Sequence, residues 1–287
     1  MPAAKYGALL EALRGVQWPA RHVVPGTMTG THRARARGVS SEFTEYRAYR
    51  QGDDPRRLDW RLLARSDRAY VRLSTEHAQL RTLIIADASA SMAFPLDGDG
   101  KWQHCCRLAV GLAAVSHADG DPVGCVIAAS GGYVRVEPRG RRGVVGEIVR
   151  LVESVRCEGA RPLAPAITAA RACPRLVVLS DLLGDLATVL AAVRTHMALG
   201  GEVHVVHIVA PQELDPPRGV VTAADPEDRA IRRPLFGAGR DAYIEAFARW
   251  RSATADALRG SGAAYIETIA GDPPDRVVRR IASGNDR

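Results

Sequence analysis

Residues 83–91, with the sequence LIIADASAS, join a short apolar run to an acidic residue and two serines. The apolar run predicts a buried strand that ends at Asp87, and Ser89 and Ser91 follow at alternate positions. A second stretch of the same kind, LVVLSD at residues 176–181, also ends in a serine and an aspartate. Strands that are apolar throughout, rather than at alternate positions, indicate a mainly parallel sheet that is covered on both faces.

The pattern continues outward from these two stretches over residues 80–287. Further apolar runs, at 123–129, 203–209 and 263–269, are separated by segments of helical periodicity such as 101–118. Strands alternating with helix-length crossovers predict an α/β fold with a doubly wound, mainly parallel, Rossmann-like sheet. In such a sheet ligands bind at the carboxyl ends of the strands, where the acidic residues stand.

The composition is that of a soluble globular protein. The chain has 287 residues, of which 46% are hydrophobic and 25% charged, and no apolar run approaches the roughly 18 residues that span a bilayer. The first residues lack the features of a secretory signal peptide, and the five cysteines include no CxxC pair. We therefore expect a cytoplasmic protein with reduced thiols and without membrane insertion.

Residues 1–79 differ from the rest and are expected to form a basic accessory segment. They hold 14 basic and 8 acidic side chains, and their apolar content is too thin for an independent domain. Arg33, Arg35 and Arg37 are suited to phosphate contacts, so nucleic-acid binding is an alternative function. Acidic residues interleaved with the arginines favour internal ion pairs instead, and we expect no nucleic-acid partner.

Four side chains at the two strand ends make a candidate metal site. Asp87, Ser89, Ser91 and Asp181 offer carboxylate and hydroxyl oxygens, which are hard ligands suited to Mg²⁺. The serines and Asp181 are also suited to capping the loops and helices that follow them. The strand context together with the second aspartate favours the metal site over capping alone.

These residues resemble known families. The strand–DASAS–helix unit and the LVVLSD strand resemble a von Willebrand factor A domain with its metal-ion-dependent adhesion site. The preceding region, with SEF, YRQGDDPRRLDW and ARSDRAYVR between residues 38 and 72, resembles the bacterial family called domain of unknown function 58. At the level of motifs the resemblance covers roughly residues 30–185.

The resemblance implies a function in protein assembly. It implies an association with MoxR-type AAA+ ATPases, in systems that act as chaperones on a client protein. The adhesion site of the family normally takes a threonine from a second loop, in a Gly-Thr-x-Leu setting. The corresponding residues here are 159–163, GARPL, so that Arg161 or Ala160 stands where the threonine is expected. We therefore expect Mg²⁺ to bind weakly or not at all, either because Arg161 repels the ion or because Arg161 itself pairs with Asp87 and Asp181.

The GDDPRRLDW stretch provides further candidate residues. Asp53 or Asp54 is suited to capping a helix with a proline near its first position. Asp59 and Trp60 are either a recognition surface or a structural contact, in which Trp60 packs on the A-like domain and Asp59 pairs with a nearby arginine. We favour the structural role.

Enzymatic function is the remaining alternative. A haloacid-dehalogenase-type phosphotransferase also places an aspartate at the end of its first strand, but it needs a second aspartate where this chain has Ser89. The sequence contains no GxGxxG after its first strand and no GxxxxGK[ST]. We therefore predict a non-enzymatic adaptor, with phosphotransfer or hydrolysis at Asp87 as the weaker hypothesis.

Overall fold

The structure is a computed structural model of the chain. It describes residues 2–20, 29–33, 45–50, 58–66, 68–73, 77–95, 100–219, 222–224, 230, 232–234 and 237–284. Asp53, Asp54, Arg35 and Arg37 lie outside the described residues, and Arg33 is described by its backbone alone. The predictions that fall on these residues stay predictions.

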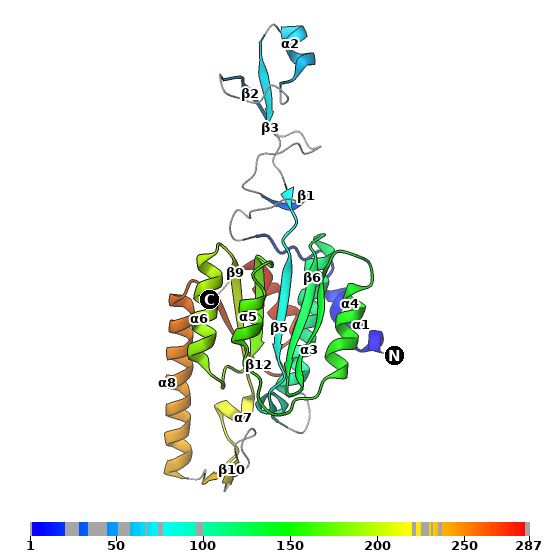
Figure 1. The fold of residues 1–287 in the computed structure, drawn as a ribbon. Coiled ribbons are helices and arrows are strands. Elements are labelled where there is room, and N and C mark those ends of the chain that lie inside the picture. Colours follow the sequence, from blue (N-terminus) through cyan, green and yellow to red (C-terminus); the bar gives the residue numbers. More distant parts are fainter. Residues whose placement is uncertain are drawn as a thin grey trace. The chain divides into compact units, whose positions relative to one another are not determined.

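Six strands form a sheet in the order β12-β9-β8-β5-β6-β7 (Figure 1). They are β5 (Thr82–Asp87), β6 (Val123–Ala129), β7 (Gly132–Arg139), β8 (Arg175–Ser180), β9 (Glu202–Val209) and β12 (Ala264–Ile269). Neighbouring strands are parallel except β6 and β7, which form an antiparallel hairpin. Strand β5 is central, with β6 on one side and β8 on the other. The expected doubly wound, mainly parallel sheet is confirmed.

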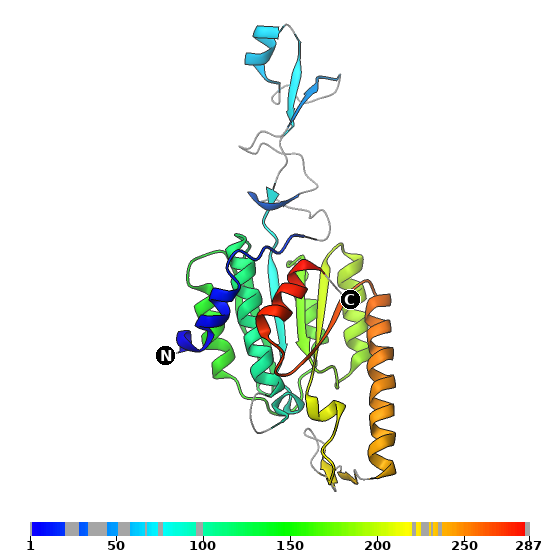
Figure 2. The same ribbon diagram turned by 180° about the vertical axis from the view of Figure 1, so that it is seen from behind.

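Helices cover both faces of the sheet. One face carries α1 (Pro2–Ala12), α3 (Lys101–Ala118), α4 (Val144–Ser154) and α9 (Pro274–Ser283), and the other carries α5 (Ala164–Ala169), α6 (Leu186–Ala198) and α8 (Ala238–Gly260). Figure 2 shows α1 and α9 on the same side. Successive strand residues enter opposite cores, as Ile84 and Ile85 do, which explains why the strands are apolar throughout. None of the helices in the described ranges is long and apolar enough to cross a membrane.

Helix α1 belongs to the core of the larger unit, which corrects the predicted boundary at residue 79. The structure divides into unit 1, residues 1–19 with 81–287, and unit 2, residues 20–80. Tyr6, Leu9 and Leu13 are buried in the same apolar core as α3 and α9. The N-terminal helix is therefore part of the α/β unit, and unit 2 is an insertion between α1 and β5.

A glycine allows α1 and α9 to approach α3 closely. A methyl group added at Gly111 would lie 2.9 Å from Cγ2 of Val278 and 3.0 Å from Cδ1 of Leu13. These distances are shorter than ordinary van der Waals contact, so a larger residue would push the helices apart. The first and last helices of unit 1 thus meet on the middle of α3.

A buried arginine at the start of β8 holds the chain where it leaves unit 1 and where it returns. Arg175 donates from one guanidinium nitrogen to the carbonyls of Trp18 (3.1 Å) and Pro19 (3.0 Å), and its guanidinium lies 4.3 Å from the Trp18 ring centroid. Its backbone N–H donates to the carbonyl of Arg81 (3.2 Å). The side chain is fully buried and also donates to Glu202. Both ends of the insertion are therefore fixed beside Arg175.

Unit 2 contains two short antiparallel pairs and one helix among its described residues. They are β1 (Thr29–Arg33) with β4 (His77–Ala78), β2 (Glu45–Ala48) with β3 (Tyr70–Leu73), and α2 (Trp60–Ser66). Helix α2 begins after Leu58, which pairs with Val71, and Asp59, which caps the helix; the expected helix start near Pro55 lies outside the described residues. The remaining short elements of the chain belong to unit 1: the 3₁₀ turn Ala90–Ala93, α7 (Pro211–Leu214), β10 (Thr222–Ala224) and β11 (Arg232–Pro234).

Candidate functional site

The candidate site lies where the strand order reverses, at the carboxyl ends of β5 and β8. These strands are parallel neighbours, with Ala86 opposite Leu179, so the residues that follow meet at one edge of the sheet. Asp87 and Asp181 are both buried there. The sequence pattern therefore correctly predicted that the two aspartates lie at the same edge of the sheet. Doubly wound sheets bind ligands at this edge.

Asp87 is held by hydrogen bonds from two elements. Its Oδ1 accepts the backbone N–H of Ser89 (2.9 Å) and its Oδ2 accepts the hydroxyl of Ser180 (2.6 Å). Burial and the nearby charge of Asp181 raise the pKa of Asp87, while the two hydrogen bonds act in the opposite direction. A carboxylate whose ionised form is disfavoured in the native protein is costly for stability, and such groups concentrate at functional sites.

The two serines of the motif face each other. The hydroxyls of Ser89 and Ser91 lie 3.1 Å apart, and both side chains are buried. A second loop supports this turn, because the N–H of Ala90 donates to the carbonyl of Gly159 (2.7 Å) and the N–H of Glu158 donates to the carbonyl of Ala88 (3.1 Å). The GARPL loop, which was expected to correspond to the second loop of a metal site, therefore lies next to the loop that carries Ser89 and Ser91.

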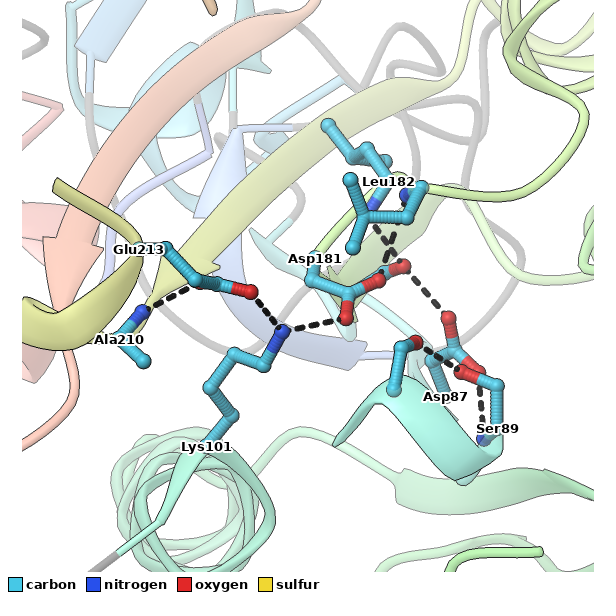
Figure 3. Close-up of polar contacts among 10 residues, drawn as sticks. Asp87, Ser89, Lys101, Asp181, Leu182, Ala210 and Glu213 are labelled. Carbon is cyan, nitrogen blue, oxygen red and sulfur yellow. Dashed lines mark hydrogen bonds and ion pairs between the residues drawn. The ribbon is translucent and has the colours of Figure 1, made fainter. Parts of the chain in front are cut away.

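Asp181 is paired with a lysine that the sequence did not single out (Figure 3). The ammonium of Lys101 lies 2.7 Å from Oδ2 of Asp181 and 2.6 Å from Oε1 of Glu213. The other carboxylate oxygen of Glu213 accepts the N–H of Ala210 (2.7 Å). The side chain of Lys101 is 0% exposed, and the opposing effects of burial and the two carboxylates leave its pKa raised. Lys101 therefore stays protonated.

The loop after β8 is held in an unusual conformation. Leu182 is buried and has φ of 58°, in the left-handed region that branched side chains rarely adopt. The hydroxyl of Ser180 accepts its N–H (2.9 Å), and Oδ1 of Asp181 accepts the N–H of Leu183 (3.3 Å). The backbone strain is thus stabilised by the same two residues that face Asp87 and Lys101.

A pocket of about 200 Å³ opens beside Asp87. Its lining side chains are apolar and polar in equal measure, and the ionisable ones are Asp87, Arg161 and Asp185. Asp185 accepts the N–H of Thr188 (3.2 Å) and caps α6. Two sides of the pocket are therefore formed by the loop after β8 and by the GARPL loop.

Arg161 lines the pocket, but the hydrogen bonds that the structure gives it do not join it to Asp87 or Asp181. Its guanidinium donates to the carbonyls of Ala129 (3.3 Å) and Ser130 (2.7 Å) and lies 5.8 Å from the ring centroid of Tyr133. The idea that Arg161 pairs with the two aspartates is therefore wrong in this geometry. The cation on Asp181 is Lys101.

The described residues of the GDDPRRLDW stretch, residues 58–60, belong to unit 2. Oδ1 of Asp59 accepts the N–H of Arg61 and of Leu62 at 3.0 Å, which is the contact of a helix cap. The Trp60 side chain is 63% exposed. A capping role for Asp59 is therefore visible. The favoured packing of Trp60 on the A-like domain stays a prediction, and a recognition surface stays its alternative.

The side chains at the strand ends fit a divalent cation poorly. One oxygen of Asp181 receives the Lys101 ammonium and the other receives a backbone N–H, while both oxygens of Asp87 receive hydrogen bonds. Within the described ranges, no group of three or more His, Cys, Asp or Glu residues is arranged to hold a metal ion. The predicted ligands are close together, but their oxygens already have partners inside the protein.

Asp87→Asn is expected to raise the free energy of unfolding near neutral pH. Because the pKa of Asp87 is raised in the folded protein, the carboxyl favours folding at low pH, and this contribution is lost as the pH rises through the folded pKa. An amide of the same shape avoids the buried charge and keeps an acceptor for the N–H of Ser89. Urea unfolding at pH 7 and pH 4 checks this. A variant that is less stable than the wild type at pH 7 would contradict it.

Comparisons with known proteins agree with this architecture. The family described as "Protein of unknown function DUF58" matches residues 45–252. Uncharacterised proteins of Mycobacterium tuberculosis and Mycobacterium bovis are 30% identical over 267 residues, which is 90% of this chain and 84% of theirs.

Among solved structures, an aerotolerance-related membrane protein of Bacteroides fragilis is similar, with a TM-score of 0.50 and 18% identity over 72% of this chain and all of that one. The protein BatB of Bacteroides thetaiotaomicron gives a TM-score of 0.48 at 18% identity, over 71% of this chain and 97% of that one. The chain thus belongs to the DUF58 family, and its α/β unit has the doubly wound fold that the resemblance to von Willebrand factor A domains implied.

Proposed function

We propose that this protein is a non-enzymatic adaptor that binds a partner protein at the strand-end pocket. The observation that carries the proposal is that an open pocket lies beside polar groups that are bonded to one another. Asp87 is held by Ser180 and by a backbone N–H, and Asp181 is held by Lys101. Groups fixed in this way are suited to rigid recognition, whereas catalysis needs a base or nucleophile directed at a substrate.

The surface around the pocket supports protein binding. Leu183, on the loop after β8, is 46% exposed, and Tyr133, which stacks with Arg161, is 37% exposed. The hydroxyl of Tyr133 donates to the carbonyl of Pro162 (2.6 Å) and so stiffens the GARPL side. Exposed apolar and aromatic side chains around a concave centre are typical of the anchoring part of a protein interface.

The class of partner follows from family membership and from the sequence. Membership of the family supports a MoxR-type AAA+ ATPase as the partner, acting on a client protein in a chaperone-like assembly. The sequence contains no P-loop of its own, so nucleotide hydrolysis would be supplied by that partner. The protein would then couple the ATPase to its client in the cytoplasm.

The experiment measures binding of the full chain to purified MoxR-type ATPases, with and without ATP, at physiological salt. We expect wild type to bind at least one of them and to change its rate of ATP hydrolysis. Leu183→Asp should weaken that binding at least tenfold, since it places a charge on the apolar rim of the pocket.

Leu199→Asp is the matched control. Leu199 is also an exposed leucine of unit 1, with 63% of its side chain exposed. It directly follows the last residue of α6, whereas Leu183 lies on the loop before the first residue of that helix. A helix of 13 residues is roughly 20 Å long, so the control lies far from the pocket. Equal losses in both variants would place the interface elsewhere, and a wild type that binds none of the ATPases would remove this class of partner.

A further inference from the structure

The ammonium of Lys101 pairs with one of the two aspartates at the strand ends and brings a buried positive charge to this edge of the sheet. Lys101 is the first residue of α3, and it reaches across the strand ends to Asp181 on one side and to Glu213 of α7 on the other. Its side chain has no exposed surface. A buried ammonium is tolerated only when it is paired and hydrogen-bonded, and both conditions are met here.

The charges at this edge require a cation. Asp87 and Asp181 converge from neighbouring strands, and Glu213 adds a third carboxylate. The charge of Asp181 is one of the factors that disfavour the ionised form of Asp87. A positive charge between Asp181 and Glu213 reduces this repulsion, and Lys101 supplies it from within the chain.

The choice of lysine over arginine agrees with this role. Lys5 and Lys101 are the only lysines among the 39 basic residues of the sequence, and the others are arginines. An ammonium is a compact point charge with three donors, similar in size to a single ion, whereas a guanidinium is a planar fork. Where Asp181 and Glu213, two carboxylates from different elements, share one cation, the chain has a lysine.

We infer that Lys101 is the resident cation of the strand-end site, and that it takes the place of the divalent ion which the aspartate–serine motif would otherwise bind. A metal ion ligated by Asp181 would compete with the ammonium for the same oxygen. The site is therefore complete without metal. The inference rests on the contacts of Lys101 and does not need the proposed partner to be correct.

Removing the lysine should convert the site into a metal site. The test variant is Lys101→Ala combined with Glu213→Gln, which removes one positive and one negative charge and so keeps the total charge. It leaves space where the lysine was, and it leaves Asp181 beside Asp87, Ser89 and Ser91. We expect this variant to bind Mn²⁺ at least tenfold more tightly than wild type by calorimetry, and to show a higher melting temperature with 1 mM Mn²⁺.

Two controls define the cause. The triple variant that adds Asp181→Asn should lose the response to Mn²⁺, because it removes the carboxylate that the ion would use. The single variant Lys101→Met keeps most of the side-chain volume without the charge. We expect it to melt at a lower temperature than wild type, and we expect Mn²⁺ not to raise that melting temperature, because the methionine side chain fills the space that the ion would need. Ethylammonium chloride at tens of millimolar should raise the melting temperature of Lys101→Ala more than sodium chloride does.

Two results would overturn the inference. The first is binding of Mg²⁺ or Mn²⁺ to the wild type with a Kd below about 100 µM, since the ammonium and the ion would then coexist. The second is a folded charge-balanced variant that gains no affinity for Mn²⁺. Wild-type calorimetry needs no variant to fold, so the inference can be rejected even when every substitution proves unstable.

Discussion

A chain that lacks residues 1–19 is expected to lose its cooperative unfolding transition. Tyr6, Leu9, Leu13 and Trp18 are all buried in the core that contains α3 and α9. Burying one large apolar side chain contributes about 1.5–3 kcal/mol, so the four together contribute on the order of 6–12 kcal/mol. That is comparable to the whole stability of a typical protein, which is about 5–15 kcal/mol. Thermal melts followed by circular dichroism check the expectation.

Removing the insertion instead of the helix is the control. A chain in which residues 20–80 are replaced by a flexible linker of about six residues should still unfold cooperatively. Pro19 and Arg81 both contact Arg175, and six residues extend over roughly 20 Å, so the gap is easily bridged. A truncation that starts near Thr82 would fail because it lacks α1, and not because it lacks unit 2. If the chain without residues 1–19 melts within 2 °C of the full chain, the assignment of α1 to the core is wrong.

Arg175→Met is expected to cost about 3–5 kcal/mol of unfolding free energy at pH 7, since it leaves buried carboxylates without their cation. Arg175 is fully buried and donates to Glu202, and its Nη1 lies 3.9 Å from Oδ2 of Asp121. It also holds the carbonyls of Trp18 and Pro19, and those contacts would be lost as well. Arg249→Met is the matched control, because Arg249 is exposed and pairs with Glu245 on the same helix. Such a pair contributes less than about 1 kcal/mol.

The cost of Arg175→Met should depend on pH. Burial alone would raise the pKa of Glu202, but hydrogen bonds from His204 and Arg175 and the charge of Arg175 outweigh it and lower the pKa to about 2. A lowered pKa stabilises the fold above the unfolded value, near 4.5, and this stabilisation is lost as the pH falls toward 2. The difference between wild type and variant should therefore shrink between pH 7 and pH 3. A difference that stays constant over this range would show that packing, and not charge, is the cause.

The sheet was predictable because each strand carries its own signal. The runs LIIA and LVVL are apolar throughout, and both strands lie between two layers of helices, so local pattern and burial agree. The approach of Asp87 and Asp181 followed from the same pattern, because parallel strands end at the same edge. The family was recognisable from the motifs before and within this region, and the match over residues 45–252 confirms it.

Lys101 was not predicted to be part of the site, although it was correctly predicted to be the first residue of a helix. A polar residue at a helix start predicts solvent exposure, and here the two carboxylates come from residues 80 and 112 positions away. Nothing in the local sequence marks that pairing. The scarcity of lysine in an arginine-rich chain was the one available signal, and base composition explains such a bias equally well.

The assignment of the first residues to the accessory segment was wrong, and Arg175 was not singled out, for the same reason. The apolar residues of α1 meet α3 and α9 across the whole length of the insertion. Arg175 begins an apolar strand, and its partners Trp18, Asp121 and Glu202 lie in three other parts of the sequence. Long-range contacts of this kind leave no periodic trace, so only the three-dimensional arrangement reveals them.

The meeting of α1 and α9 on Gly111 means that one core combines a helix made early in synthesis with a helix made late. Ribosomes add about 5–20 residues per second, so α1 exists for some tens of seconds before α9 has been made. During that time the apolar face of α1 lacks its contact with α9, because that helix has not yet been synthesised. The apolar core around α3 is therefore completed only after α9 has been made.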